Sequence, residues 1–145
     1  MRSCDGCNKC CSGIFTETIR EIPMYKGQPC FFMVANGCGD YENRPDAPCK
    51  SFYCGWVASE EIPLWMKPDQ VNAVIAFKRT NGGEEYTEIS ESDGLLDSRV
   101  LSWWFKKYVN LGGINLVYEL GGGWNWVGTE SFCNAMVERF ERSKQ

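Results

Sequence analysis

The chain has 145 residues, of which 43% are apolar and 14% aromatic, and it carries a formal net charge of −4. This size and composition predict one folded domain over residues 1–145 and argue against disorder. No apolar run approaches the roughly 18 residues of a membrane span, and the negative charge argues against general nucleic-acid binding. Since no apolar stretch follows a basic N-terminus, we expect no secretory signal and a cytoplasmic location.

Cysteine and histidine divide the chain into two parts with different chemistry. Histidine is absent, which excludes Cys–His and Ser–His catalytic pairs and zinc sites with histidine ligands. Eight of the nine cysteines fall within the first 54 residues, and Cys133 alone lies beyond them. We therefore expect a Cys-rich, loop-dominated part over 1–57, packed with a more conventional α+β part over 58–145.

The N-terminal part opens with CDGCNKCC, which places four cysteines in eight residues. Disulfides would suit a small secreted domain, but bridges at CxxC spacing close very short loops and constrain the unfolded chain little. Two thiolates three residues apart on a tight loop are the usual half-site of a zinc knuckle, and CxxCxxC is also found in ferredoxins. The sequence therefore favours a metal over disulfides.

The whole set of N-terminal cysteines suits coordination by sulfur alone. Adjacent side chains such as Cys10 and Cys11 diverge, so they serve different centres, or one binds a metal and the other packs in the core. Eight thiols divide naturally into two Cys₄ sites, which suit Zn²⁺ or an iron–sulfur cluster such as [4Fe–4S]. The expected metal ligands are Cys4, Cys7, Cys10, Cys11, Cys30, Cys38, Cys49 and Cys54.

The second part begins with a predicted β-hairpin and a helix. Residues 71–78 alternate apolar and polar side chains, and residues 84–90 form the returning strand after a turn rich in Gly and Asn. Over 95–110 the apolar residues recur at helical spacing, and the glycines at 112–113 mark the end of that helix.

A second predicted hairpin and a final helix complete the chain. Residues 114–120 and 124–128 read as strands around a turn of three glycines, and a helix starts at about Ser131. The order ββαββα predicts a small antiparallel sheet covered by two helices. Cys133 lies on the last helix and is expected to be a buried, inert thiol, and Trp124 and Trp126 are expected to pack in the core.

The N-terminal motifs resemble the CxxCxxCC cysteine-cluster family, a family of zinc- or iron-chelating domains. The resemblance rests on CDGCNKCC, Cys30-Phe31, Cys38 three residues before Tyr41, Arg44-Pro45, and CKSFYC at 49–54, in that order. It differs at Phe31, where the family usually has Pro, at Asp40, where an apolar residue is usual, and in the spacing between Pro45 and Cys49.

The resemblance implies chelation of zinc or iron. Some longer relatives are flagellin lysine N-methylases associated with an iron–sulfur centre, but this chain has no fingerprint for S-adenosylmethionine, so that activity does not transfer. We expect a metal-binding protein with a structural Zn²⁺ and no catalytic residues, whose partner is the metal ion. The alternatives are an iron–sulfur enzyme or electron-transfer protein, and a metal carrier.

Overall fold

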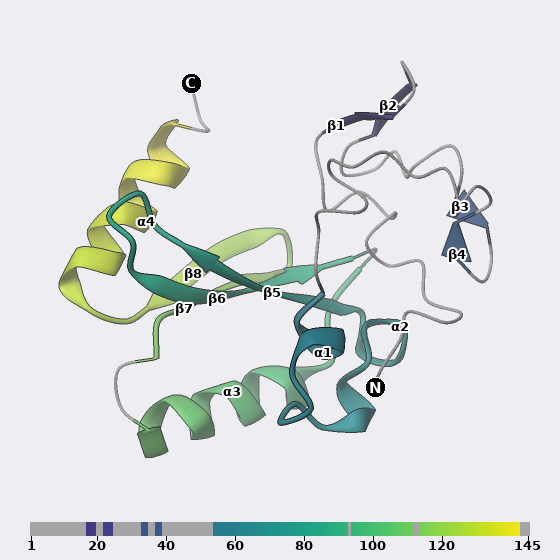
Figure 1. Ribbon diagram of the computed structural model, residues 1–145, viewed down its shortest axis with the longest axis horizontal. Helices are drawn as coiled ribbons and strands as arrows, with labels where there is room; N and C mark the ends of the chain where they lie inside the picture. The colour runs from purple at the N-terminus through teal and green to yellow at the C-terminus, as the bar shows by residue number, and fades with distance from the viewer. Residues whose placement is uncertain are drawn as a thin grey trace.

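The computed structural model describes residues 54–92, 94–111 and 114–142, together with the backbone of short strands in the N-terminal part (Figure 1). These strands form two antiparallel pairs. They are β1 (Glu17–Ile19) with β2 (Ile22–Met24), and β3 (Met33–Val34) with β4 (Gly37–Cys38).

The second part is an α+β unit, as predicted. Its helical segments are α1 (Gly55–Ala58), the 3₁₀ turn η4 (Leu64–Met66), α2 (Pro68–Val71), α3 (Ser98–Leu111) and α4 (Glu130–Arg142). Its strands are β5 (Ala73–Arg79), β6 (Glu85–Glu91), β7 (Leu116–Leu120) and β8 (Gly123–Val127).

The four strands form one mixed sheet in the order β5-β6-β7-β8. The two hairpins are antiparallel, as expected, but β6 and β7 run parallel, with Thr87 beside Leu116 and Ile89 beside Tyr118. The prediction of a purely antiparallel sheet is therefore wrong at its centre. The physical reason is the connection: α3 carries the chain back along the sheet before β7 starts, and such a crossover joins parallel strands.

The first core lies between the sheet and α3. Alternation along the strands places Ala73, Ile75 and Ile89 on the face that α3 covers, and all three are 0% exposed. Val100 and Trp104 of α3 pack against them. In Figure 1, α1 and α2 lie on the same side of the sheet as α3.

The second core lies on the opposite face, under α4 (Figure 1). It joins Tyr86 and Val117 of the sheet to Phe132 and Met136 of the helix. Trp124 and Trp126 of β8 are partly buried against this cluster, and each ring stacks on Phe140 with centroids 5.4 Å apart. The expected core packing of these two tryptophans is therefore confirmed.

The predicted elements of the second part are confirmed to within a few residues, but the sequence patterns do not predict α1 and α2. Both have four residues, which is too short for an apolar period to appear. Val71, expected in the first strand, instead ends α2. Asn72 then adopts the left-handed conformation with φ 56°, and its Nδ2 donates to the carbonyl of Gly94 at 2.8 Å.

Candidate metal centre

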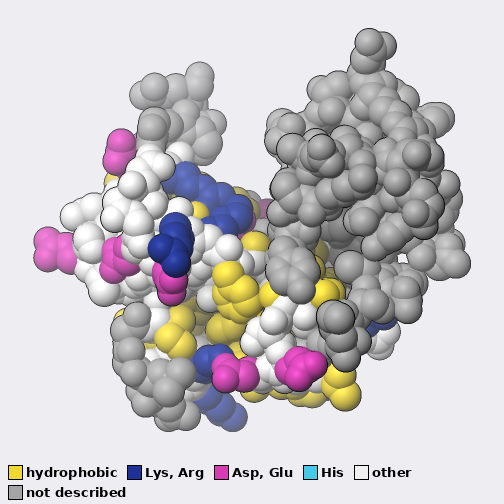
Figure 2. All heavy atoms as spheres, viewed as in Figure 1, with side chains coloured by type: hydrophobic (Ala, Val, Ile, Leu, Met, Phe, Trp, Pro, Cys, Tyr) yellow, Lys and Arg dark blue, Asp and Glu magenta, His cyan; other side chains and the backbone are white. Residues whose placement is uncertain are grey.

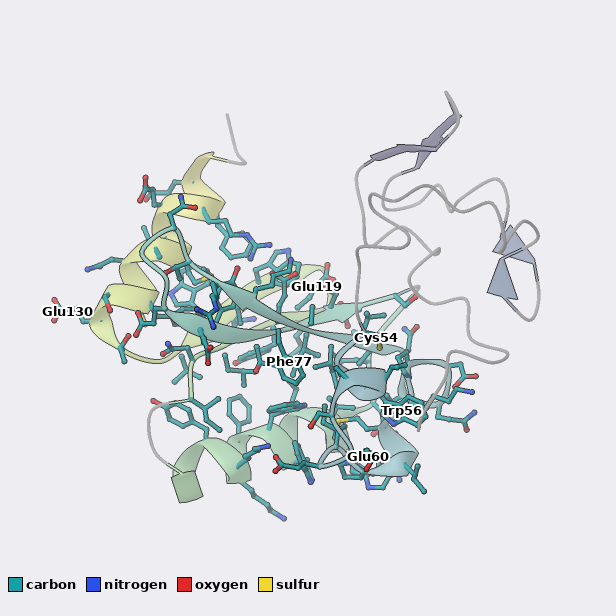
Figure 3. All side chains as sticks on the ribbon, in the orientation of Figure 1. Cys54, Trp56, Glu60, Phe77, Glu119 and Glu130 are labelled. Atoms are coloured by element: carbon teal, nitrogen blue, oxygen red, sulfur yellow. The ribbon has the colours of Figure 1, made fainter. Side chains whose placement is uncertain are left out.

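Two of the expected ligands fall among the residues that the structure describes. Cys38 is described as backbone in β4, where it pairs with Met33. Cys54 is described with its side chain and stands directly before α1 (Figure 3). The other expected ligands lie outside the described residues: Cys4, Cys7, Cys10, Cys11, Cys30 and Cys49.

Cys54 occupies the cap position of α1. Its backbone has φ −57° and ψ 129°, and its carbonyl accepts a hydrogen bond from the amide of Ala58 at 3.0 Å. The side chain is half-buried and packs against the core beneath the sheet. The last cysteine of the closing motif is therefore held by the folded α+β unit.

Gly55 explains how closely this point approaches the sheet. A Cβ atom on Gly55 would lie 2.7 Å from Cγ2 of Ile75 and 2.9 Å from its carbonyl oxygen. Trp56 is 7% exposed and donates from Nε1 to the carbonyl of Pro63 at 3.1 Å. Together the close approach and the buried indole fix α1, and Cys54 with it, on β5.

Sequence reasoning did not single out Gly55. The one hint in the sequence is the position of this glycine, between the last cysteine of the motif and a tryptophan. Glycine is often found where two backbones approach closely, because it has no side chain. The contact with Ile75 depends on how α1 is placed on the sheet, so the sequence does not specify it.

The buried carboxylates of the described α+β unit are used in its own structure. Glu91 is 4% exposed, and its two oxygens accept the amides of Leu96 and Gly122 at 3.1 and 2.9 Å. Glu119 is equally buried and accepts the amide of Glu91 at 3.0 Å. Within the residues that the structure describes, no group of three or more Cys, Asp or Glu side chains could hold a metal ion.

Glu88 joins α4 to the sheet. Its carboxylate is buried and pairs with Lys78 of the adjacent strand at 2.6 Å and with Nη1 of Arg139 on α4. Arg139 also lies 4.8 Å from the ring of Phe140. Both cations are partly exposed, so the buried carboxylate is neutralised by groups that keep some contact with water.

Glu84 directly precedes β6, and its side chain reaches the start of α4, where it accepts hydrogen bonds from two hydroxyl groups. Thr129 Oγ1 donates at 2.6 Å and Ser131 Oγ at 2.8 Å. These bonds favour the ionised carboxylate and lower the pKa of Glu84, with Thr129 the larger cause. Thr129 Oγ1 also accepts the amide of Phe132, which caps the helix.

We expect Thr129→Val to raise the pKa of Glu84 toward its ordinary value of 4.5, whereas Thr129→Ser keeps it low. Because the folded-state pKa lies below the unfolded one, ionised Glu84 stabilises the fold above about pH 4.5. That contribution is lost as pH falls through the folded-state pKa. Carboxyl-carbon NMR titration measures the shift, and an identical Glu84 titration in both variants would contradict this role of the hydroxyl.

Cys133, the cysteine not expected to bind metal, lies on α4 at the second core. Its side chain is half-buried rather than fully buried, packs against the second cluster, and lies with Sγ 3.7 Å from the carbonyl oxygen of Gly128. It is therefore on the opposite side of the sheet from the core that Cys54 contacts.

Comparison of the chain with models of protein families, with curated proteins and with solved structures gives no match. The likeness to the cysteine-cluster family therefore rests on the motif residues themselves. Among the helices that the structure describes, none has the length and apolar character needed to cross a bilayer.

Proposed function

We propose that the protein binds Zn²⁺, or iron as an ion or an iron–sulfur cluster, through its clustered cysteine thiolates. The observation that carries this proposal is the ordered set of eight cysteines in a chain without histidine. The cysteine spacing suits half-sites of thiolate centres, and thiolates are the ligands that zinc and iron–sulfur clusters share.

The position of Cys54 supports a structural role for the metal. This side chain belongs to a motif of the Cys-rich part, yet its backbone is built into α1 and its sulfur contacts the first core. A centre that includes Cys54 would tie the Cys-rich loops to the sheet. The free energy of metal binding would then stabilise the folding of those loops.

A closed four-thiolate site leaves no open position for a substrate, so we propose structural rather than catalytic zinc. The second candidate is an iron–sulfur protein, which the CxxCxxC spacing favours. The two differ in colour: a zinc protein is colourless, whereas an iron–sulfur protein is brown and absorbs visible light.

The deciding measurement is the metal content of anaerobically purified full-length protein, by mass spectrometry, together with its absorption spectrum. We expect two equivalents of zinc if all eight thiolates bind in four-thiolate sites, and one equivalent if only four of them do. Substoichiometric metal combined with the absence of titratable thiols would overturn the proposal in favour of disulfides.

Cys54→Ser is expected to lower the metal content, because it removes one ligand of a four-thiolate site. Cys133→Ser is the matched control, since Cys133 is also a half-buried cysteine but lies at the second core. It is expected to keep the full metal content. Equal loss of metal from both variants would show that Cys54 has no special part in the centre.

A further inference from the structure

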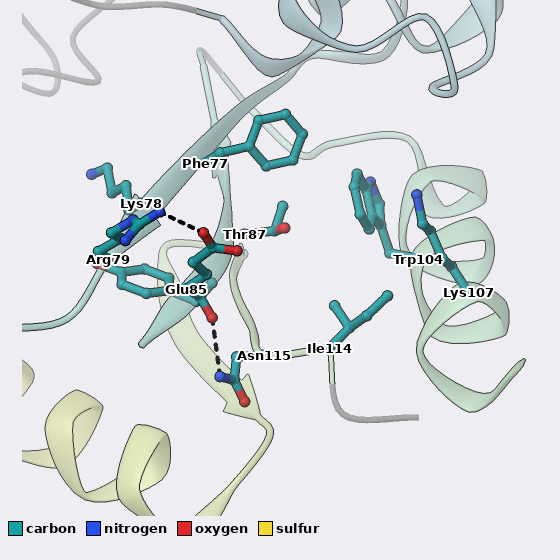
Figure 4. Close-up of a pocket in the computed structure, with 10 residues that line it drawn as sticks. Phe77, Lys78, Arg79, Glu85, Thr87, Trp104, Lys107, Ile114 and Asn115 are labelled. Carbon is teal, nitrogen blue, oxygen red and sulfur yellow. Dashed lines mark hydrogen bonds and ion pairs between the residues drawn. The ribbon is translucent and has the colours of Figure 1, made fainter. Parts of the chain in front are cut away.

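A groove opens between the sheet and α3, at the end of the sheet where β5 ends and β6 begins. Its volume is about 700 Å³, within the range of sites for small organic molecules. Figure 4 shows Phe77 and Thr87 on the sheet side, Trp104 and Lys107 on α3, and Ile114 at the entrance to β7. Figure 2 shows apolar side chains in a hollow of this face.

The groove exists because the sheet and α3 do not meet along their whole length. Phe77 shares a sheet face with Ile75, two residues earlier, yet Ile75 is 0% exposed and Phe77 is 49% exposed. Trp104 is 2% exposed and forms part of the opposite wall. An apolar ligand body placed between Phe77 and Trp104 would remove the phenyl ring from water.

Trp104, which lines the groove, carries a buried hydrogen-bond donor without an acceptor. Among the described residues, the indole nitrogen of Trp104 is the buried side-chain nitrogen or oxygen that lacks a hydrogen-bond partner. A buried donor of this kind is unusual, because leaving it unpaired costs free energy. Thr87, which lies across from Trp104 in Figure 4, adds a hydroxyl group to the same site. Both groups suit a ligand that carries oxygen acceptors.

Lys107 supplies positive charge at the same wall. Its Nζ lies 5.2 and 5.4 Å from the ring centroids of Trp103 and Trp104, within cation–π range. Its ion pair with Glu61 is long, at 3.5 Å, and the Glu61 side chain is 83% exposed. A long pair with an exposed partner contributes little, so Lys107, itself 24% exposed, can exchange Glu61 for an anion in the groove.

We propose that this groove binds a small organic anion with an apolar body, an aryl- or alkyl-carboxylate. The apolar body lies between Phe77 and Trp104, and the carboxylate lies toward Lys107. Its oxygens accept hydrogen bonds from the ammonium and from the Trp104 indole. The groove is built from the α+β unit, so the proposal does not depend on the metal.

The test uses 4-phenylbutyrate as the probe and 4-phenylbutyramide as its neutral counterpart, with the whole chain as purified. Titration followed by ¹H–¹⁵N NMR reports on the indole N–H of Trp104, assigned with Trp104→Phe. We expect the acid to shift this resonance with a Kd on the order of 0.1–1 mM. The amide is expected to bind about 10-fold more weakly, because it loses the charge-assisted bond.

Matched variants separate charge from apolar contact. Lys107→Met is expected to remove the preference for the acid over the amide. Lys106→Met is the control: it changes the net charge equally, but Lys106 is exposed on α3 outside the groove. This control variant is expected to keep the preference. Phe77→Ser is expected to weaken both ligands about 10-fold. Leu120→Ser is its control, because Leu120 is 47% exposed but does not line the groove.

Trp104→Phe keeps a large aromatic side chain but removes the donor, and we expect it to weaken the acid several-fold. Binding by this variant is followed through the backbone amides of β5 and β6. Equal affinities for acid and amide in the unmodified protein would overturn the proposal. So would an effect of Lys106→Met as large as that of Lys107→Met, or unchanged binding of the acid by both Phe77→Ser and Trp104→Phe.

Discussion

Phe132→Ala is expected to destabilise the protein by about 4 kcal/mol, the typical cost of emptying a fully buried phenylalanine site. Phe132 is 0% exposed, and its ring lies 5.3 Å from that of Tyr86, centroid to centroid. The cavity would collapse little, because Gly128 brings the backbone against the same ring. A Cβ on Gly128 would lie 2.7 Å from Phe132 Cδ2. Urea unfolding measures the free-energy change.

Val137→Ala is the control for this prediction. Val137 is on the same helix but is 39% exposed, so its truncation is expected to change the free energy of unfolding by no more than about 0.5 kcal/mol. Similar losses in the two variants would show that α4 is not attached to the sheet through Phe132. A loss in Phe132→Ala below about 1 kcal/mol would show the same.

Gly55→Ala is expected to destabilise the protein by about 2 kcal/mol, in the range found when a packed core is overfilled. The added methyl group would lie 2.9 Å from the carbonyl oxygen of Ile75, which belongs to a paired strand and cannot move aside alone. Alanine has the higher helix propensity, so a loss of stability would isolate the steric contact. A fall of about 5–10 °C in Tm is the expected readout.

Gly82→Ala is the matched control, because a Cβ at Gly82 would meet its nearest neighbour, Thr80 Oγ1, at 3.8 Å. It is expected to change Tm by less than about 2 °C. Gly55→Ala also displaces Cys54. Under the proposed function, this variant should therefore lose metal to a chelator more readily than the unmodified protein, whereas Gly82→Ala should lose metal no faster. A Tm unchanged by Gly55→Ala would contradict the close packing of α1 on β5.

These contacts hold the elements of the second part of the chain together. Side chains at α1 and α3 cover one face of the sheet, and α4 covers the other. Cys54 enters at the first of these layers. A metal centre proposed for the Cys-rich part would thus be joined to a unit that already has two apolar clusters.

Local patterns in the sequence determined most elements of this unit. Alternation of apolar residues over 71–78 and helical spacing over 95–110 predicted β5 and α3, because each pattern depends on the geometry of one element. The same holds for the two glycine-rich turns and for α4. The cysteine set, and with it the proposed ligands, is likewise a property of the sequence, since ligand chemistry follows from residue type.

Only the tertiary structure decided how these elements are combined. The parallel pairing of β6 with β7 depends on where α3 returns the chain, which no local period specifies. The roles of Gly55, Phe77 and Trp104 depend on the distance between a helix and a strand that are separate in sequence. Periodicity reports which side of an element is apolar, but the packing of one element on another determines whether that side is filled, closely approached or left open as a groove.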